Sequence, residues 1–216
     1  MVKYSVIALL LLSIQVIRAQ NTVCFDITAN PNANSTAFSS FTKYIHVLDC
    51  FSIYAESSIP DEKVLHVASV AAELLDNDED GAVDDPLLKA ELASNNALIP
   101  IFSYDGSSAM NNFFDHYDGE GAAAVLWRNE IDPNNPGYWG ADATVEEVVH
   151  VINAIGHTNI YPSAFAVEPN SSLLTTAMDV ARGGQFIQHP NNYPPESWYH
   201  YDDYTCDYEC MAIEYL

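Results

Sequence analysis

The chain has 216 residues and a strong excess of acid, since 30 Asp and Glu face 7 Lys and Arg and the formal net charge is −23. A surface of this sign repels nucleic acid and anionic lipid, which excludes both as partners, and it attracts cations. Calcium is the expected partner, because it prefers oxygen ligands and is abundant outside cells. Hydrophobic residues make up 49% of the chain, with 3 Trp and 13 Tyr, which argues for a packed core and against disorder.

The first 19 residues, MVKYSVIALLLLSIQVIRA, have the pattern of a secretory signal peptide: an early Lys3, an apolar run over 6–12 and a small Ala19. That run is too short to span a bilayer, and no other stretch approaches the roughly 20 apolar residues that a membrane helix needs. We therefore predict an exported protein without a membrane span. Loss of Lys3 and Arg18 with the signal lowers the formal charge from −23 to −25. Residues 20–216 are predicted to form one globular domain.

The next segments alternate between strand and helix patterns. Residues 44–55, YIHVLDCFSIYA, read as a strand or hairpin that ends at Ser58. From Pro60 the apolar period becomes helical up to Leu75, and a second, shorter helix begins at Pro86, after Asp84 or Asp85, and runs to 93. Short strands are expected at 96–102 and 122–127, followed by a loop over 129–142.

The C-terminal third is predicted to be mainly helical. Residues 144–155 have the strongest helix pattern, with Val145, Val148, Ile152 and Ile155 toward the core and Gly156 as its end. Residues 171–184 form a second helix between a serine cap and a Gly-Gly end, with Arg182 expected to pair with carboxylates. A Pro- and Tyr-rich loop then leads to a last helix within 205–216. The fold class is thus α+β with helices dominant. Because the sequence stops within an apolar and aromatic pattern, we expect it to be the N-terminal part of a longer chain.

Four cysteines in an exported chain favour disulfides over metal-bound thiolates. Three pairings are possible, and we predict Cys24 with Cys50 and Cys206 with Cys210. Across one regular helical turn the Cβ atoms of the second pair would stand roughly 6 Å apart, beyond disulfide reach, so the backbone there should be irregular. Asn34 and Asn170 begin glycosylation sequons and are expected at the surface.

Residues 76–84, DNDEDGAVD, have acids at positions one, three, five and nine, a glycine at six and an apolar residue at eight. The segment resembles the calcium loop of EF-hands and dockerin modules, in which alternate side chains converge on one ion between two helices. The resemblance implies calcium ligands at Asp76, Asp78, Asp80, Ala82 and Asp84. Position twelve is Leu87, so Asp84, Asp85 or water must close the shell, and we expect a weak site of about 10⁻⁴ to 10⁻³ M. The alternative is a solvated acidic turn.

On the helix over 144–155, Glu146, His150, Asn153 and His157 lie on one stripe. The stretch Glu146-Glu147-Val-Val-His150 resembles the zincin motif H-E-x-x-H, which implies Glu146 and His150 as metal ligands and Glu147 as the general base. A carboxylate in place of the first histidine would suit a harder metal than zinc. Two other interpretations compete: residues 144–147 as a capping box that explains Glu147 by helix initiation, and an ordinary polar helix face.

A third ligand would come from elsewhere in the chain. Glu214 could face this helix as a glutamate does in gluzincins. Its rivals are His157, His189, His200, Asp202 and Asp203, and residues 199–208 could equally be a disulfide-tied aromatic loop.

The interpretation that we favour is a secreted acidic calcium-binding glycoprotein. Its composition is similar to that of soluble proteins of extracellular or mineralised matrices, which implies calcium ions, a mineral surface or matrix proteins as partners. The alternative is a secreted zincin-like metallohydrolase that holds zinc or another divalent metal at Glu146, His150 and Glu214.

Overall fold

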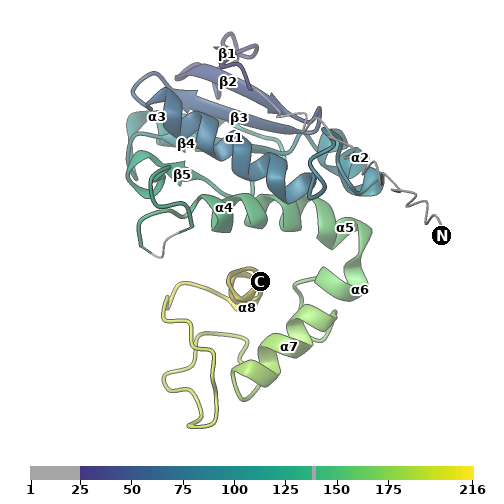
Figure 1. Ribbon diagram of the computed structural model, residues 1–216. Coiled ribbons are helices and arrows are strands. Elements are labelled where there is room, and N and C mark those ends of the chain that lie inside the picture. The colour runs from purple at the N-terminus through teal and green to yellow at the C-terminus, as the bar shows by residue number, and fades with distance from the viewer. Residues whose placement is uncertain (1–24, 138–139) are drawn as a thin grey trace, which may run out of the picture.

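The computed structural model describes residues 25–137 and 140–216 (Figure 1). The predicted signal peptide and Cys24 lie outside the described residues. The described part is α+β, as predicted, with more residues in helices than in strands. Within it, none of the helices combines the length and the apolar character that crossing a membrane requires.

A mixed five-stranded sheet organises the N-terminal two thirds of the described chain, in the spatial order β1-β2-β3-β4-β5. Its first three strands pair antiparallel. β4 then pairs parallel with β3, and β5 pairs parallel with β4. The predicted hairpin is confirmed: β2 and β3 meet at a tight turn in which Leu48 and Asp49 both have positive φ, as hairpins favour. The strands are β1 (Thr28–Ala29), β2 (Phe41–Val47), β3 (Phe51–Glu56), β4 (Leu98–Phe102) and β5 (Leu126–Trp127).

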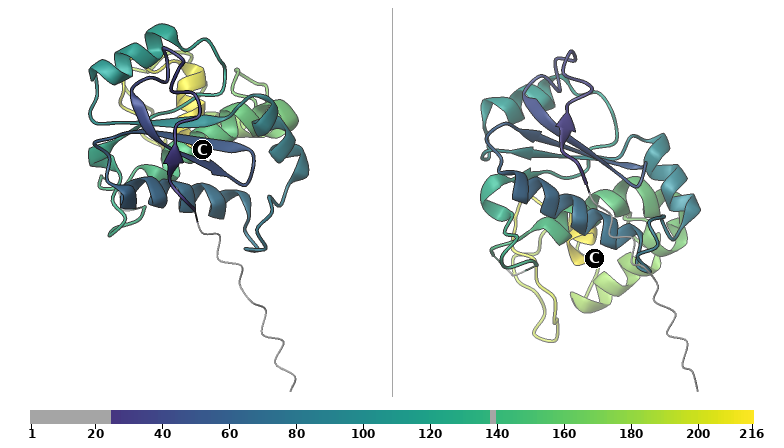
Figure 2. Two further views of the ribbon diagram at one scale, coloured as in Figure 1. Left: turned by 90° about the horizontal axis from the view of Figure 1, so that it is seen from above. Right: turned by 45° about the horizontal axis from the view of Figure 1, so that its top comes forward.

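Helices cover both faces of the sheet (Figure 2). Alternate side chains of a strand point to opposite faces. Ile53 of β3 therefore joins the core under α1 and α4, and Tyr54 joins a second, aromatic core under α3. These helices are α1 (Asp61–Leu75), α2 (Pro86–Ser94), α3 (Ser108–His116) and α4 (Thr144–Val151). The predicted helices at 60–75 and 86–93 are confirmed, α3 was not predicted, and only 126–127 of the expected strand at 122–127 pair with the sheet.

The helix that begins with α4 does not end at Gly156, so that prediction was wrong. It continues as a π-helix over Ile152–His157 and then as α5 (Thr158–Ile160). Gly156 is buried against α2, where an added Cβ would clash with a methyl carbon of Leu88. The glycine thus permits two helices to approach closely. The expected burial holds for Val148, Ile152 and Ile155, whereas Val145 is 42% exposed.

The C-terminal segments form a separate layer next to α4 (Figure 1). The predicted serine cap at Ser172 and the Gly183-Gly184 end of the helix are confirmed. The last helix passes near α4 and forms, with α7, a small core around Met178 and Met211. The helices of this layer are α6 (Pro162–Phe165), α7 (Leu173–Ala181) and α8 (Tyr208–Tyr215).

A buried carboxylate, Asp142, fixes the start of α4. It accepts hydrogen bonds from the Thr144 hydroxyl at 2.6 Å and the Gly137 amide at 2.8 Å, and it lies 2.9 Å from His66 Nε2 on α1. Burial raises the pKa of this carboxyl, but these contacts together outweigh burial and lower the pKa from 3.8 to about 2. Asp142 thus joins α1, the loop residues Asp132 and Gly137, and α4 at one point.

We predict that Asp142→Asn lowers the free energy of unfolding at neutral pH by about 2 kcal/mol. Because the folded carboxyl has a depressed pKa, its contribution is present above pH 3.8 and is lost as the pH falls toward 2. Urea unfolding across this range should therefore show a flatter pH dependence for the variant. The control is Asp49→Asn, whose side chain is 87% exposed. An identical pH dependence in variant and parent would contradict this role.

Candidate metal centre

Two of the predicted ligands, Glu146 and His150, are held on one face of α4. The helix places residues four apart on the same side, and Val148 and Val151 are fully buried in the core. His150 is only 9% exposed, whereas Glu146 is exposed. The stripe is therefore fixed by the packing of the apolar side of α4.

The capping-box interpretation of Glu147 is wrong. Ala143 occupies the N-cap position without a side-chain hydrogen bond, and the Thr144 hydroxyl donates to Asp142. The Glu147 side chain instead faces the cleft, with Oε2 at 3.6 Å from His150 Nδ1. Helix initiation thus does not explain Glu147.

The structure brings Glu214 of α8 to this stripe. A carboxylate oxygen of Glu146, a ring nitrogen of His150 and a carboxylate oxygen of Glu214 all lie within 4.8 Å of one another. None of the rival ligands belongs to such a group within the described ranges. His189 contacts the Tyr201 carbonyl oxygen and His200 contacts the Ser197 hydroxyl.

Negative charge accumulates around His150. Its own burial lowers its pKa, but the close contact with the Glu147 carboxylate and the charges of Glu147, Glu214 and Glu146 outweigh this and raise it. Burial, and then the charges of Glu146 and Glu147, raise the pKa of Glu214. Nearby, burial and the same two charges raise the pKa of Glu130 to about 7. The cluster therefore favours the approach of a cation.

A cleft of about 370 Å³ opens beside this cluster. Residues 122–125 and Trp127 form one wall. Residues 122–125 precede β5, the last strand of the sheet, and Trp127 belongs to it. Glu147, His150 and Glu214 line the same cleft, together with Cys210 and Ile213 of α8. The candidate ligands thus lie beside a strand that has no partner on its outer side within the described sheet.

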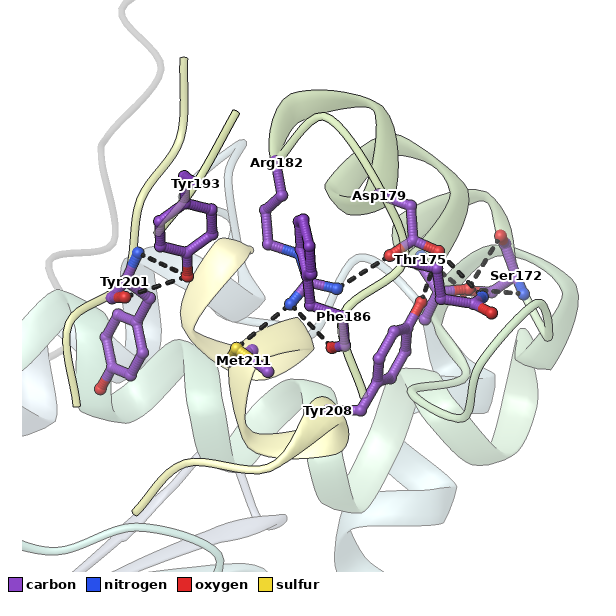
Figure 3. A network of polar contacts seen from close by, with 10 residues as sticks. Ser172, Thr175, Asp179, Arg182, Phe186, Tyr193, Tyr201, Tyr208 and Met211 are labelled. Atoms are coloured by element: carbon purple, nitrogen blue, oxygen red, sulfur yellow. Dashed lines mark hydrogen bonds and ion pairs between the residues drawn. The ribbon is translucent and has the colours of Figure 1, made fainter. Parts of the chain in front are cut away.

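A fully buried arginine, Arg182, holds α8 in place (Figure 3). Its guanidinium contacts Asp179 Oδ1 at 2.8 Å and the Met211 sulfur at 3.1 Å, and it donates to the Phe186 carbonyl oxygen at 3.3 Å. It also lies over the ring of Tyr208, whose hydroxyl donates to Asp179 at 2.9 Å. The expected pairing of Arg182 with a carboxylate is confirmed. Since Met211 is one turn from Glu214, this network fixes the position of the third candidate ligand.

The predicted Cys206–Cys210 disulfide is present, with the Cα atoms 5.3 Å apart. The bond is possible because Cys206 precedes α8 and the backbone at Asp207 is extended, so the two cysteines do not share a regular helical turn. Cys50 is a buried thiol whose pKa burial raises to about 11, and its predicted partner Cys24 lies outside the described residues. Asn34 and Asn170 are both exposed.

The aspartate-rich loop lies between α1 and α2. One carboxylate oxygen from each of Asp76, Asp78 and Asp84 lies within 4.8 Å of the other two. Asp76 is 3% exposed and accepts hydrogen bonds from the backbone N–H groups of Asp80 and Gly81. Glycine is required at position 81, where φ is +89°.

The remaining predicted ligands of this loop behave differently. Asp80 Oδ1 accepts from the Ala82 amide at 3.0 Å and is not part of the group of three. Ala82 could offer only its backbone carbonyl oxygen. Asp85 does not close the loop, because it caps α2 and accepts a hydrogen bond from the Tyr161 hydroxyl at 2.7 Å. Asp84 is therefore the acid that approaches Asp76.

Sequence reasoning missed two features near the site. The π-helix begins at Ile152, two residues after His150, and π-helical turns are frequent at functional sites. Asn153 in this segment is fully buried, and neither atom of its amide group has a hydrogen-bond partner in the described part of the chain. The second feature is α3, whose Phe114 contributes to the cleft. Ser107 as its cap and Phe113 on its buried side were signals that could have revealed it.

Comparison of the chain with protein-family models, with curated proteins and with solved structures finds no match. The candidate function must therefore be argued from the chemistry of the site itself.

We predict that Asp179→Asn loosens α8, because it leaves the buried Arg182 without a carboxylate. The expected loss in the free energy of unfolding is about 3 kcal/mol. Hydrogen exchange of the α8 amides should accelerate more than exchange in β3. The matched control is Asp115→Asn, on the exposed side of α3. Unchanged exchange in α8 would show that the ion pair does not hold this helix.

Proposed function

We propose that the protein is a secreted metal-dependent hydrolase with its metal centre at Glu146, His150 and Glu214. The single observation that carries the proposal is the convergence of these three side chains, from two helices far apart in sequence, beside a cleft. Two carboxylates and one imidazole form a donor set that suits a divalent transition metal. The second carboxylate shifts the preference from zinc toward harder ions such as manganese.

The chemistry that such an ion supplies when bound is polarisation of a carbonyl group and acidification of water. Glu147 is the proposed general base, because its carboxylate lines the cleft next to His150 and has no role in capping α4. The charges of Glu146, Glu147 and Glu214 raise the pKa of His150, so a metal ion must displace a proton from this imidazole but then gains a more basic ligand.

The proposed substrate is an extended peptide. Residues 122–125 and Trp127 line the cleft at the edge of the sheet, and an open edge can pair with an extended chain through backbone hydrogen bonds. Trp127 lines the cleft, and its indole Nε1 is buried and has no acceptor within the described residues. This arrangement would place a peptide carbonyl near the cluster.

The metal proposal predicts a graded response to ligand removal. Glu146→Ala, His150→Ala and Glu214→Ala should each weaken Mn²⁺ or Zn²⁺ binding by about 10- to 100-fold in calorimetry. Glu147→Gln should retain the metal but lose about 100-fold or more of peptide hydrolysis, since it removes only the base.

The control for this series is His116→Ala, an exposed histidine outside the cluster, which should leave metal binding unchanged. Binding that survives the loss of His150 would place the metal elsewhere. Stoichiometric metal without hydrolysis of any peptide in a diverse library would leave a binding centre and contradict the catalytic part of the proposal.

A second candidate function is calcium binding by an acidic glycoprotein of an extracellular or mineralised matrix. The observation that favours it is the convergence of Asp76, Asp78 and Asp84 between α1 and α2, with Val83 anchored in the core. The two functions are compatible, because a calcium ion in this loop would stabilise the start of α2, the helix on which the π-helix packs.

The calcium proposal predicts that millimolar calcium raises the melting temperature of the protein. At a calcium concentration 100 times the dissociation constant the gain in stability would be about 2.7 kcal/mol. Asp76→Asn and Asp84→Asn should each abolish the shift, because each removes a charged ligand, whereas Asp105→Asn in an exposed loop should not. A calcium-independent melting temperature in the parent protein would remove this candidate.

A further inference from the structure

A second cavity, of about 400 Å³, lies on the face of the sheet opposite α1 and α4. We name it the aromatic pocket, after the four Phe and Tyr rings among its lining residues. Its floor includes Tyr54 and Leu98, which belong to the aromatic core under α3. The residues that matter here are Phe38, Tyr44, Tyr54, Tyr117, Asp118 and Glu120.

The rings of the pocket are held in place before any ligand binds. Tyr54 packs against Phe38 and Tyr44, with ring centroids 4.6 Å and 4.9 Å away. The Tyr54 hydroxyl accepts a hydrogen bond from the Asn32 amide at 2.8 Å. The Tyr117 ring stacks on Phe113 at 4.7 Å, and its hydroxyl accepts from the Gly121 amide at 3.1 Å. Pre-formed cavities of this kind are typical of small-ligand sites.

The rim of the pocket is negatively charged. Asp118 and Glu120 are exposed, and neither makes a hydrogen bond or an ion pair in the described part of the chain. Both act on Tyr117: burial raises the pKa of that phenol, and the two carboxylates raise it further. No Lys or Arg is among the residues that line the pocket. The phenol therefore stays neutral, and the pocket combines aromatic rings with unpaired carboxylates.

These groups discriminate between ligand classes. The basic side chains that line the pocket are two histidines, His46 and His116, and no Lys or Arg. An anion would be repelled by the rim carboxylates and by the protein as a whole, which has a net charge of −23. A purely apolar ligand would leave the carboxylates and amides of the rim unused. A cation gains twice, because the faces of aromatic rings and carboxylates both attract it. Methylene groups attached to that cation would pack on the rings.

We infer that the aromatic pocket binds an alkylammonium group, from either a free aliphatic amine or a lysine side chain. The aromatic floor would take the alkyl chain and the ammonium, and Asp118 and Glu120 would pair with its charge. This site is separate from the metal centre in its residues, and its occupation depends on neither proposed function.

The test is calorimetric titration of the mature protein with cadaverine, in parallel with the neutral diol of the same length. We expect saturable binding of cadaverine at millimolar concentration and none of the diol. N-acetyl-lysine amide, titrated alongside, distinguishes the two sources: comparable binding assigns a peptide lysine, and binding of cadaverine alone assigns a free amine.

The double variant Asp118→Asn/Glu120→Gln should weaken cadaverine binding by about tenfold, and Tyr44→Leu by a similar factor. The matched control is Asp105→Asn/Asp115→Asn, which removes the same charge from exposed positions outside the pocket and should change affinity by less than about twofold. If the control weakened cadaverine binding as much as the rim variant does, the binding would reflect diffuse attraction to an acidic surface, and the inference would be overturned. Binding of the diol or of a methyl glucoside in place of the amine would overturn it as well.

Discussion

The crowding of three carboxylates around one buried imidazole, His150, is the constraint on which the candidate site depends. Glu146 and Glu147 reach His150 from its own helix, and Glu214 reaches it from α8. Like charges at this distance repel, and the raised pKa of Glu214 records that repulsion together with the effect of burial. A bound divalent cation would offset this repulsion, because each of the carboxylates that repel one another would be attracted to the ion.

The rest of the fold holds α4 and α8 in fixed positions relative to each other. Asp142 joins the start of α4 to α1 and to the preceding loop, and the apolar side of α4 packs under the sheet. Arg182 and the Cys206–Cys210 disulfide hold α8 from the other side. Buried ionic groups of this kind are costly to leave unpaired, so each link resists displacement of the helix that it holds. The β5 edge completes the cleft without contributing a charge.

The parts of this structure that depend on local pattern could be predicted from the sequence. The hairpin over 41–56, the helices α1 and α2, the Ser172 cap and the short disulfide all follow from residue spacing within one or two turns. The sequence offered Glu214 as one of several candidates for a third ligand, and nothing local fixed its distance from α4. The features that escaped prediction depend on contacts between distant segments.

Gly156 shows this limit most clearly. In sequence it has the form of a helix terminator, but in the fold its missing side chain makes room for Leu88. Glu147 is similar, because the capping box was a sound local interpretation and the hydrogen bond from Thr144 to Asp142 excludes it. The aromatic pocket could not be anticipated at all, since its rings come from a loop, two strands and the segment after α3.

The most direct measurement of the central claim is an X-ray structure of the protein crystallised with Mn²⁺, with anomalous diffraction data to locate the ion. The account predicts an anomalous peak bound by one imidazole nitrogen, from His150, and by carboxylate oxygens of Glu146 and Glu214. A crystal saturated with manganese in which these three side chains surround no anomalous peak would contradict it.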